Sequence, residues 1–259
     1  MTALERTFCH CAGVGPTTEA RLWRSGVGGW SDVLMGRARG LVSASLGDRL
    51  LDTVAQSQAK LASADARWFA KVLPPSEHWR AHDALGDRIA FLDIETTGSF
   101  GEDLTTVVGI HDGNTLHQFV RHENLRDWLD LIADRTLLVT FSGASFDLPF
   151  LRREFGVPLD VLHIDLCPLL RKLGYKGGLK SVEQQLGLAR PDSTAGLTGH
   201  DAVRLWFDWE HNDNTDALET LLAYNAEDVL NMRHLLAFAL ERMHERLWGD
   251  SAVGEAALR

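Results

Sequence analysis

Residues 88–98 read RIAFLDIETTG, and this stretch decides the fold. It begins as an apolar run with the length and composition of a buried strand, and the run ends on two acids, Asp93 and Glu95. Residues two apart on a strand point to the same side, so the two carboxylates lie next to each other. Adjacent carboxylates repel each other unless a cation lies between them, and hard oxygen ligands favour Mg²⁺ or Mn²⁺. The stretch therefore predicts a strand that carries part of a metal site.

The segments that follow alternate between strand and helix patterns. Residues 104–112 and 114–122 are predicted strands joined by a hairpin at Gly113-Asn114. Further elements are expected in the order helix 123–134, strand 136–141, helix 146–155 and strand 161–166, followed by helices that include a long one from Thr215 to Leu247. An antiparallel meander leading into βα units predicts an α/β protein, with a mixed five-stranded sheet flanked by helices.

The first 85 residues have a different, helical character. A tight turn at residues 13–16, Gly-Val-Gly-Pro, is followed by a helix that begins near Thr17 and ends at Gly26. Apolar residues at helical spacing over 37–73 predict one or two amphipathic helices, and Pro74-Pro75 stops them. Residues 74–86 are expected to be a linker. We therefore predict a small all-helical region over 1–85, before the α/β domain at 86–250.

The composition is that of a soluble globular protein. Of the 259 residues, 45% are hydrophobic and 24% are charged, and no apolar run approaches the roughly 20 residues of a membrane helix. No secretory signal is recognisable, so we expect a cytoplasmic protein without a membrane partner. The net charge of −10 is uneven, because residues 1–85 hold 10 Lys/Arg against 8 Asp/Glu. The acidic remainder predicts a weak grip on phosphate, or help from a protein partner.

Three cysteines, Cys9, Cys11 and Cys167, form no disulfide framework by their number or spacing. We expect free thiols and a reducing compartment. The triplet Cys9-His10-Cys11 resembles part of a zinc site, but a structural zinc site needs a second pair of ligands, and the sequence offers none. The triplet is therefore interpreted as ordinary residues of the helical region.

Two further motifs carry acids that could complete the site on the first strand. Asp147 follows the fourth strand at a helix N-terminus, where a carboxylate is often only a cap, but the strand order would place it near Asp93. In the stretch YNAED, Tyr224 and Asp228 are four residues apart and share one face of a helix. Glu227 points about 100° away from that face, so Asp228 is the better candidate ligand.

These three motifs, in this order and on these elements, resemble the DEDD superfamily of 3′→5′ exonucleases. Tyr224 stands four residues before the last acid, whereas Ala223 occupies the position of the histidine in the other subclass, so the resemblance is to the tyrosine subclass. The similarity is closer still to ribonuclease-H-like exonuclease domains of the YprB type, through the stretches FLDIETTG, FSGASFDLPFL, HIDLCPLLRKLG, GGLKSVEQQLGL and LLAYNAEDVLNM. The resemblance implies a ribonuclease-H-like fold and a metal-dependent nuclease.

The resemblance also implies a role for each residue of the motifs. Asp93, Glu95, Asp147 and Asp228 would hold two Mg²⁺ or Mn²⁺ ions at the scissile phosphate, and Tyr224 would orient the attacking water. The product would be nucleoside 5′-monophosphates. The candidate nucleic-acid contacts are Lys180, Thr96, Gly98, Ser142, Gly13 and Gly15. At Ser142 the family often has Asn, and Gly13 and Gly15 belong to a turn that resembles a helix-hairpin-helix element.

Several functions remain open at this point. DNA, in single-stranded form, is the favoured substrate, but an exoribonuclease would need only a local contact to the 2′-hydroxyl. A structure-selective endonuclease is an alternative on the same fold, although the Asp-x-Glu and Tyr-x₃-Asp spacings favour the exonuclease. A catalytically silent nucleic-acid-binding adaptor is a third alternative, and the presence of all four carboxylates and the tyrosine argues against it.

Overall fold

The computed structural model describes residues 1–98 and 103–256. The chain forms two compact units, which are described separately below. The first comprises residues 1–87 together with 160–164, and the second comprises residues 88–159 together with 165–259. Within the described residues, no helix combines the length and apolar character needed to cross a membrane.

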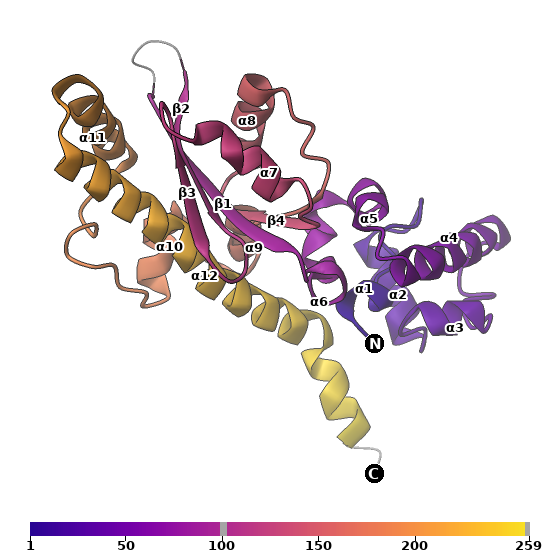
Figure 1. Ribbon diagram of the computed structural model, residues 1–259. Coiled ribbons are helices and arrows are strands. Elements are labelled where there is room, and N and C mark those ends of the chain that lie inside the picture. Colours follow the sequence, from indigo (N-terminus) through magenta and orange to yellow (C-terminus); the bar gives the residue numbers. More distant parts are fainter. Residues whose placement is uncertain (99–102, 257–259) are drawn as a thin grey trace. The chain divides into compact units, whose positions relative to one another are not determined.

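The first unit consists of helices around a core that includes Trp30 and Phe69. Its elements, drawn in indigo to purple in Figure 1, are α1 (Ala3–Arg6), α2 (Pro16–Arg24), α3 (Trp30–Leu34), α4 (Ala44–Ala62), α5 (Ala66–Val72), the 3₁₀ helix η1 (Pro75–Ala81) and α6 (His82–Leu85). The end of α2 is as predicted, because Ser25 caps the helix and Gly26 adopts a positive φ of 84°. The sequence predicts one or two amphipathic helices before Pro74, and the structure has two, α4 and α5.

The predicted linker at 74–86 is wrong, because η1 and α6 fill most of it. Arg80 in η1 is 3% exposed and forms ion pairs with Glu77, at 2.7 Å, and with Glu19 of α2, at 2.9 Å. A buried arginine needs such partners, and Glu19 lies 61 residues away in the sequence. Trp79 is also buried. These long-range contacts order a segment whose prolines and polar residues suggested a loop.

The Cys9-His10-Cys11 triplet lies inside the first unit, and all three cysteines of the chain are free. Burial is the main cause that raises the pKa of the Cys9 and Cys11 thiols to about 12, so both remain protonated at neutral pH. The Nε2 atom of His10 lies 2.8 Å from the Ser57 hydroxyl on α4. Burial, assisted by the charge of Arg80, lowers the pKa of His10 to about 4.

We expect His10 to make the stability of the protein depend on pH. The unfolded chain, with a His pKa of about 6.5, takes up the proton first, so the stabilisation is complete above that pH. It is lost as the pH falls towards 4, by about 2 kcal/mol at pH 5. Urea unfolding at pH 7 and pH 5 should therefore show a smaller difference for His10→Gln than for the unmodified protein. Equal differences in the two proteins would contradict the assignment. The pKa of His78 is also lowered by burial, but His78 remains in both proteins and contributes equally to each difference.

A mixed sheet has the strand order β3-β2-β1-β4-β5, and its strands β1 to β4 belong to the second unit. The strands are β1 (Ile89–Thr96), β2 (Thr105–His111), β3 (Leu116–Val120), β4 (Leu137–Thr140) and β5 (Leu162–Asp165). β1 pairs antiparallel with β2 and parallel with β4, and β2 pairs antiparallel with β3. This confirms the predicted α/β sheet and the hairpin at Gly113-Asn114, where Gly113 has a positive φ of 100°.

Helices flank this sheet, and the longest of them positions the site. They are η2 (Leu125–Asp127), α7 (Trp128–Ile132), α8 (Asp147–Phe155), α9 (Leu166–Lys172), α10 (Leu179–Gln185), α11 (Gly199–Asn212) and α12 (Thr215–Ala256). α12 packs against β1, β2 and β3, and Figure 1 shows it running beside the sheet. The helix predicted at 123–134 is shorter than expected and starts as a 3₁₀ turn. This is the mixed sheet with flanking helices of the ribonuclease-H-like fold, preceded by helices.

Candidate metal centre

Three of the four predicted metal ligands come together at the face of β1 that α12 covers. Oxygen atoms of Asp93 and Glu95 on β1 and of Asp228 on α12 all lie within 4.8 Å of one another. Glu95 is 8% exposed and Asp228 is 7% exposed, whereas Asp93 is partly exposed. The alternation of the strand aligns the first two carboxylates, as the sequence predicts. The packing of α12 on β1 brings the third from a position more than 130 residues later in the chain.

Asp147, the fourth predicted ligand, lies beside this group and not within it. It is the first residue of α8 and is 4% exposed, and its Oδ1 atom accepts a hydrogen bond from the backbone N–H of Ile94, at 3.2 Å. The bond ties the start of α8 to the middle of β1. The negative charge of Asp147 contributes to the raised pKa values of Asp93 and Glu95, so the four carboxylates form one electrostatic unit.

The protein provides too little positive charge to balance these four carboxylates. Burial, followed by the repulsion of Asp228, raises the pKa of Asp93 and of Glu95 well above the usual range. Burial also raises the pKa of Asp147 to about 7, and it raises that of Asp228 against the opposing effect of Arg190. Carboxylates in such surroundings take up protons or bind a cation. The donor set, all carboxylate oxygen, fits Mg²⁺ or Mn²⁺.

Tyr224 lies one helical turn before Asp228 and is 6% exposed. Burial, with the negative charges of Asp228, Glu95 and Asp93, raises the pKa of its hydroxyl far above neutrality. The hydroxyl therefore stays protonated and can take part in hydrogen bonds without acting as a base. The Nζ atom of Lys180 lies 4.2 Å from the centre of the Tyr224 ring, in the geometry of a cation–π contact.

Lys180, which the sequence analysis proposes as a phosphate contact, has a buried ammonium group. Its Nζ atom is shielded from solvent and has no hydrogen-bond partner in the described part of the chain. Burial lowers the pKa of this lysine, while the charges of Asp228 and Glu95 act in the opposite direction. The structure thus places an unsatisfied cation beside the carboxylates and the tyrosine.

Asn225 is a site residue that the sequence analysis missed. Its Nδ2 atom donates to Oδ2 of Asp93, at 3.0 Å, and its Oδ1 atom accepts from Nε2 of Gln118, at 3.1 Å. Asp93, Gly109 and Gln118 are cross-strand partners in one row of the sheet. A Cβ atom on Gly109 would lie only 2.1 Å from Oδ1 of Asn225, so the glycine makes room for the amide. A glycine inside the predicted strand 104–112 is the signal that could have revealed this close approach.

Glu183 and Arg190 form an ion pair at the site that was also not predicted from the sequence. Arg190 follows α10, and its Nε and Nη2 atoms lie 2.7 Å from the two carboxylate oxygens of Glu183. Its Nη2 atom also forms an ion pair with Oδ1 of Asp228. No spacing rule links residues 183, 190 and 228, because the loop after α10 brings the arginine to the site.

The other predicted contacts in the second unit lie in turns near the ends of β1 and β4. Ser142 has a positive φ of 65°, a conformation that Asn adopts more readily than Ser, and its N–H donates to Asp165 at 2.8 Å. Gly98 also has a positive φ, of 62°, and its N–H donates to the Thr96 hydroxyl at 3.3 Å. The backbone conformation thus explains the glycine at 98 and supplies a structural reason for an asparagine at 142.

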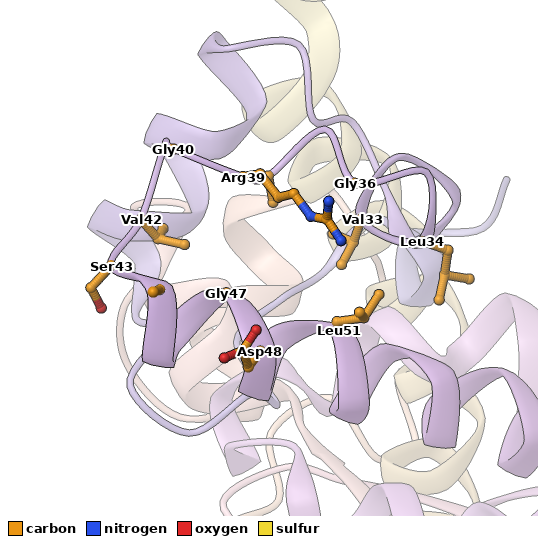
Figure 2. A pocket seen from close by; sticks show the side chains of 12 residues that line it. Val33, Leu34, Gly36, Arg39, Gly40, Val42, Ser43, Gly47, Asp48 and Leu51 are labelled. Carbon is orange, nitrogen blue, oxygen red and sulfur yellow. The ribbon is translucent and has the colours of Figure 1, made fainter.

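Gly13 and Gly15 belong to the first unit. Gly13 has a positive φ of 90°, and Gly15 is the N-cap of α2, which no side chain caps. A pocket of about 440 Å³ in this unit is formed by other residues, between the segment after α3 and the start of α4. Figure 2 shows Arg39 and Asp48 among its apolar lining. The predicted turn and the pocket are therefore separate features.

Phe146, directly before Asp147, is another residue that the sequence analysis passed over. It is 49% exposed and is one of three large apolar side chains on the surface of the described part of the chain. Its ring lies 5.7 Å from that of Phe150 on α8, centre to centre. An exposed aromatic ring next to a predicted ligand is a surface on which a nucleobase could stack.

None of the curated proteins matches the chain's sequence. Among solved structures, the family B DNA polymerase from the hyperthermophilic archaeon Pyrobaculum calidifontis is similar, with 16% sequence identity and a TM-score of 0.46. The similar region covers 60% of this chain and 24% of the polymerase, so it corresponds to about a quarter of that protein. The family model of the RNase_H superfamily matches residues 90–239, which is more than half of the chain. The match includes nearly all of β1, most of α12 and the carboxylates Asp93, Glu95, Asp147 and Asp228. The chain belongs to the RNase_H superfamily.

Proposed function

We propose that this protein is a metal-dependent 3′→5′ exonuclease of the tyrosine subclass, which releases nucleoside 5′-monophosphates from single-stranded DNA. The observation that carries the proposal is the convergence of Asp93, Glu95 and Asp228, with Asp147 and Tyr224 beside them, on a ribonuclease-H-like sheet. Buried carboxylates at this density are unfavourable without cations, which makes a purely structural role a poor explanation.

The chemistry follows from the residues present. Two bound Mg²⁺ or Mn²⁺ ions would supply Lewis acidity that activates water and stabilises the charge developing on the phosphate. Asp93, Glu95, Asp147 and Asp228 would hold these ions. The protonated hydroxyl of Tyr224 would orient the attacking water by a hydrogen bond, and the unsatisfied ammonium of Lys180 would bind a phosphate oxygen.

Two features support a single strand as the substrate. Phe146 offers a base-stacking surface, which a base reaches only when it is unpaired. The acidic second unit gives little general attraction for duplex phosphate, so local contacts must contribute most of the affinity. In this proposal, Thr96, Gly98 and Ser142 contact the strand near the cleavage site. Gly13 and Gly15 offer backbone N–H groups to a phosphate at the start of α2.

We expect Tyr224→Phe to slow turnover by about 10- to 100-fold, because the variant keeps the ring and loses only the hydrogen bond to the water. The affinity for Mn²⁺, measured by calorimetry, should stay within about twofold, since the hydroxyl is not a ligand. A variant that hydrolyses DNA normally, or one that loses Mn²⁺ binding, would show that the role assigned to the tyrosine is incorrect.

A digestion time course tests the proposed function. The purified protein is incubated with 5′-labelled single-stranded DNA, duplex DNA and RNA of one sequence, in Mg²⁺, in Mn²⁺ and in EDTA. The proposal requires a metal-dependent ladder that shortens from the 3′ end, fastest on single-stranded DNA. Faster digestion of RNA would identify an exoribonuclease, and cleavage of a circular substrate would identify an endonuclease. Binding without cleavage in any metal would favour the adaptor.

A further inference from the structure

Arg190 is held rigidly beside the metal centre by residues outside it. Its side chain is 4% exposed, and two parallel hydrogen bonds of 2.7 Å join it to Glu183 of α10. Glu183 is itself held by Nδ2 of Asn231 on α12, at 3.0 Å. A two-bond pair of this kind fixes the plane of the guanidinium group as well as its position. Arg190 is therefore positioned independently of its contact to Asp228.

The same guanidinium occupies one oxygen of Asp228. The Nη2 atom of Arg190 forms an ion pair with Oδ1, and the side chain of Asp228 is only 10% exposed. A carboxylate with one oxygen committed to an arginine presents its other oxygen, here Oδ2, to a cation. Carboxylates bind Ca²⁺ through one or both oxygens, whereas Mg²⁺ is smaller and demands near-octahedral geometry, which suits ligands that each give one oxygen.

We propose that Arg190 determines the metal specificity of the centre, by restricting Asp228 to one ligand oxygen and thereby favouring Mg²⁺ and Mn²⁺ over Ca²⁺. The inference rests on the proposed function insofar as it takes Asp228 to be a metal ligand. Arg190 is a positioning residue, since it acts through Asp228.

A role in stability alone accounts less well for the arrangement. Burying an ion pair gives little net stabilisation, and apolar residues of similar size often do as well. A pair that served only to link α10 with the following loop would be complete with Glu183 and Arg190. The contact to Asp228 adds a positive charge next to a predicted cation site, which by itself weakens cation binding. Control of the geometry of Asp228 is a function that explains this contact.

Two matched variants distinguish a role of Arg190 in metal specificity from a role in stability alone. Glu183→Gln removes the charge of the anchor but keeps one acceptor oxygen for Arg190, whose ion pair with Asp228 remains. The double variant Glu183→Gln/Arg190→Gln removes the arginine as well, without leaving Glu183 charged and unpaired in the interior. Titration calorimetry gives the dissociation constants of Mg²⁺, Mn²⁺ and Ca²⁺ for each protein, and thermal unfolding without metal shows whether each variant is folded.

We expect the unmodified protein and Glu183→Gln to bind Mn²⁺ more tightly than Ca²⁺ by similar ratios. In the double variant this ratio should fall by roughly tenfold, the lower end of the effect of residues that orient metal ligands. If the folded double variant has the same Mn²⁺-to-Ca²⁺ ratio as Glu183→Gln, the proposal is overturned. Arg190 and Glu183 would then be a pair with a structural role only. If the double variant does not fold, Glu183→Met/Arg190→Met replaces it, because apolar residues of similar size often substitute for a buried ion pair, and an unchanged ratio there has the same meaning.

The outcome is distinguishable from a failure of the proposed function. Metal binding is measured without substrate, so a protein that binds Mn²⁺ selectively but hydrolyses no nucleic acid would contradict the exonuclease and still test Arg190. A protein that binds none of the three ions would overturn both statements at once.

Discussion

Asp93→Asn is expected to abolish hydrolysis while making the metal-free protein more stable. The substitution removes one charge from a group of carboxylates whose pKa values are raised by burial and mutual repulsion. Relief of that repulsion should increase the free energy of unfolding by about 1 kcal/mol, since one pKa unit corresponds to about 1.4 kcal/mol. Loss of a residue that would hold the cations should reduce the rate by about 10³-fold or more, equivalent to about 4 kcal/mol.

The order of stabilities should reverse when metal is added. If the proposed metal site is correct, Mn²⁺ should bind the folded state of the unmodified protein and raise its melting temperature, whereas the variant lacks one of the proposed ligands. Thermal unfolding in EDTA and in Mn²⁺ measures this crossover. Glu227→Gln is the matched control, because it removes a carboxylate from the position next to Asp228 but outside the cluster. If Asp93→Asn retains the rate of the unmodified protein, or if the control loses it, the metal site is misplaced.

Gly109→Ala is expected to damage both stability and activity, although alanine normally suits a strand better than glycine. The new Cβ atom would lie 2.1 Å from Oδ1 and 2.9 Å from Cγ of Asn225. Asn225 is fully buried and hydrogen-bonded on both sides, to Gln118 and to Asp93, so it cannot turn away without breaking these bonds. We expect a loss of about 2–3 kcal/mol in the free energy of unfolding, typical of overpacking in a core.

The activity of Gly109→Ala should fall by about 10- to 100-fold, because Asp93 loses the amide that orients it. A double-variant experiment identifies the cause. Asn225→Ala removes Oδ1 and Cγ, although Cγ2 of Val229 still lies 2.9 Å from the new Cβ atom. The loss of stability in Gly109→Ala/Asn225→Ala should therefore be smaller than the sum of the losses in the two single variants. The activity of the double variant should stay at the low level of Asn225→Ala, since the bond to Asp93 is still missing. Full activity in Gly109→Ala would mean that the strand adjusts and that the amide is dispensable.

Elements with a strong periodic pattern were the part of the fold that the sequence predicted well. β1, the β2–β3 hairpin, β4, β5 and the long helix α12 lie where the apolar spacing and turn residues place them. The errors are at segments without such a pattern. The expected linker at 74–86 is helical because Arg80 binds Glu19, a contact over 61 residues that no local pattern encodes.

The candidate site likewise has some features that the sequence predicts and others that only the folded chain determines. The sequence by itself determined that Asp93 and Glu95 lie side by side and that Tyr224 and Asp228 share a helix face, because strand and helix periods are local properties of the backbone. Only the tertiary structure decided that these two pairs meet, that Asn225 reaches Asp93 across Gly109, and that Arg190 reaches Asp228. Those contacts depend on how α12 and the loop after α10 pack on the sheet. Packing is set by the shapes of side chains distant in sequence, and it leaves no periodic signal in the chain.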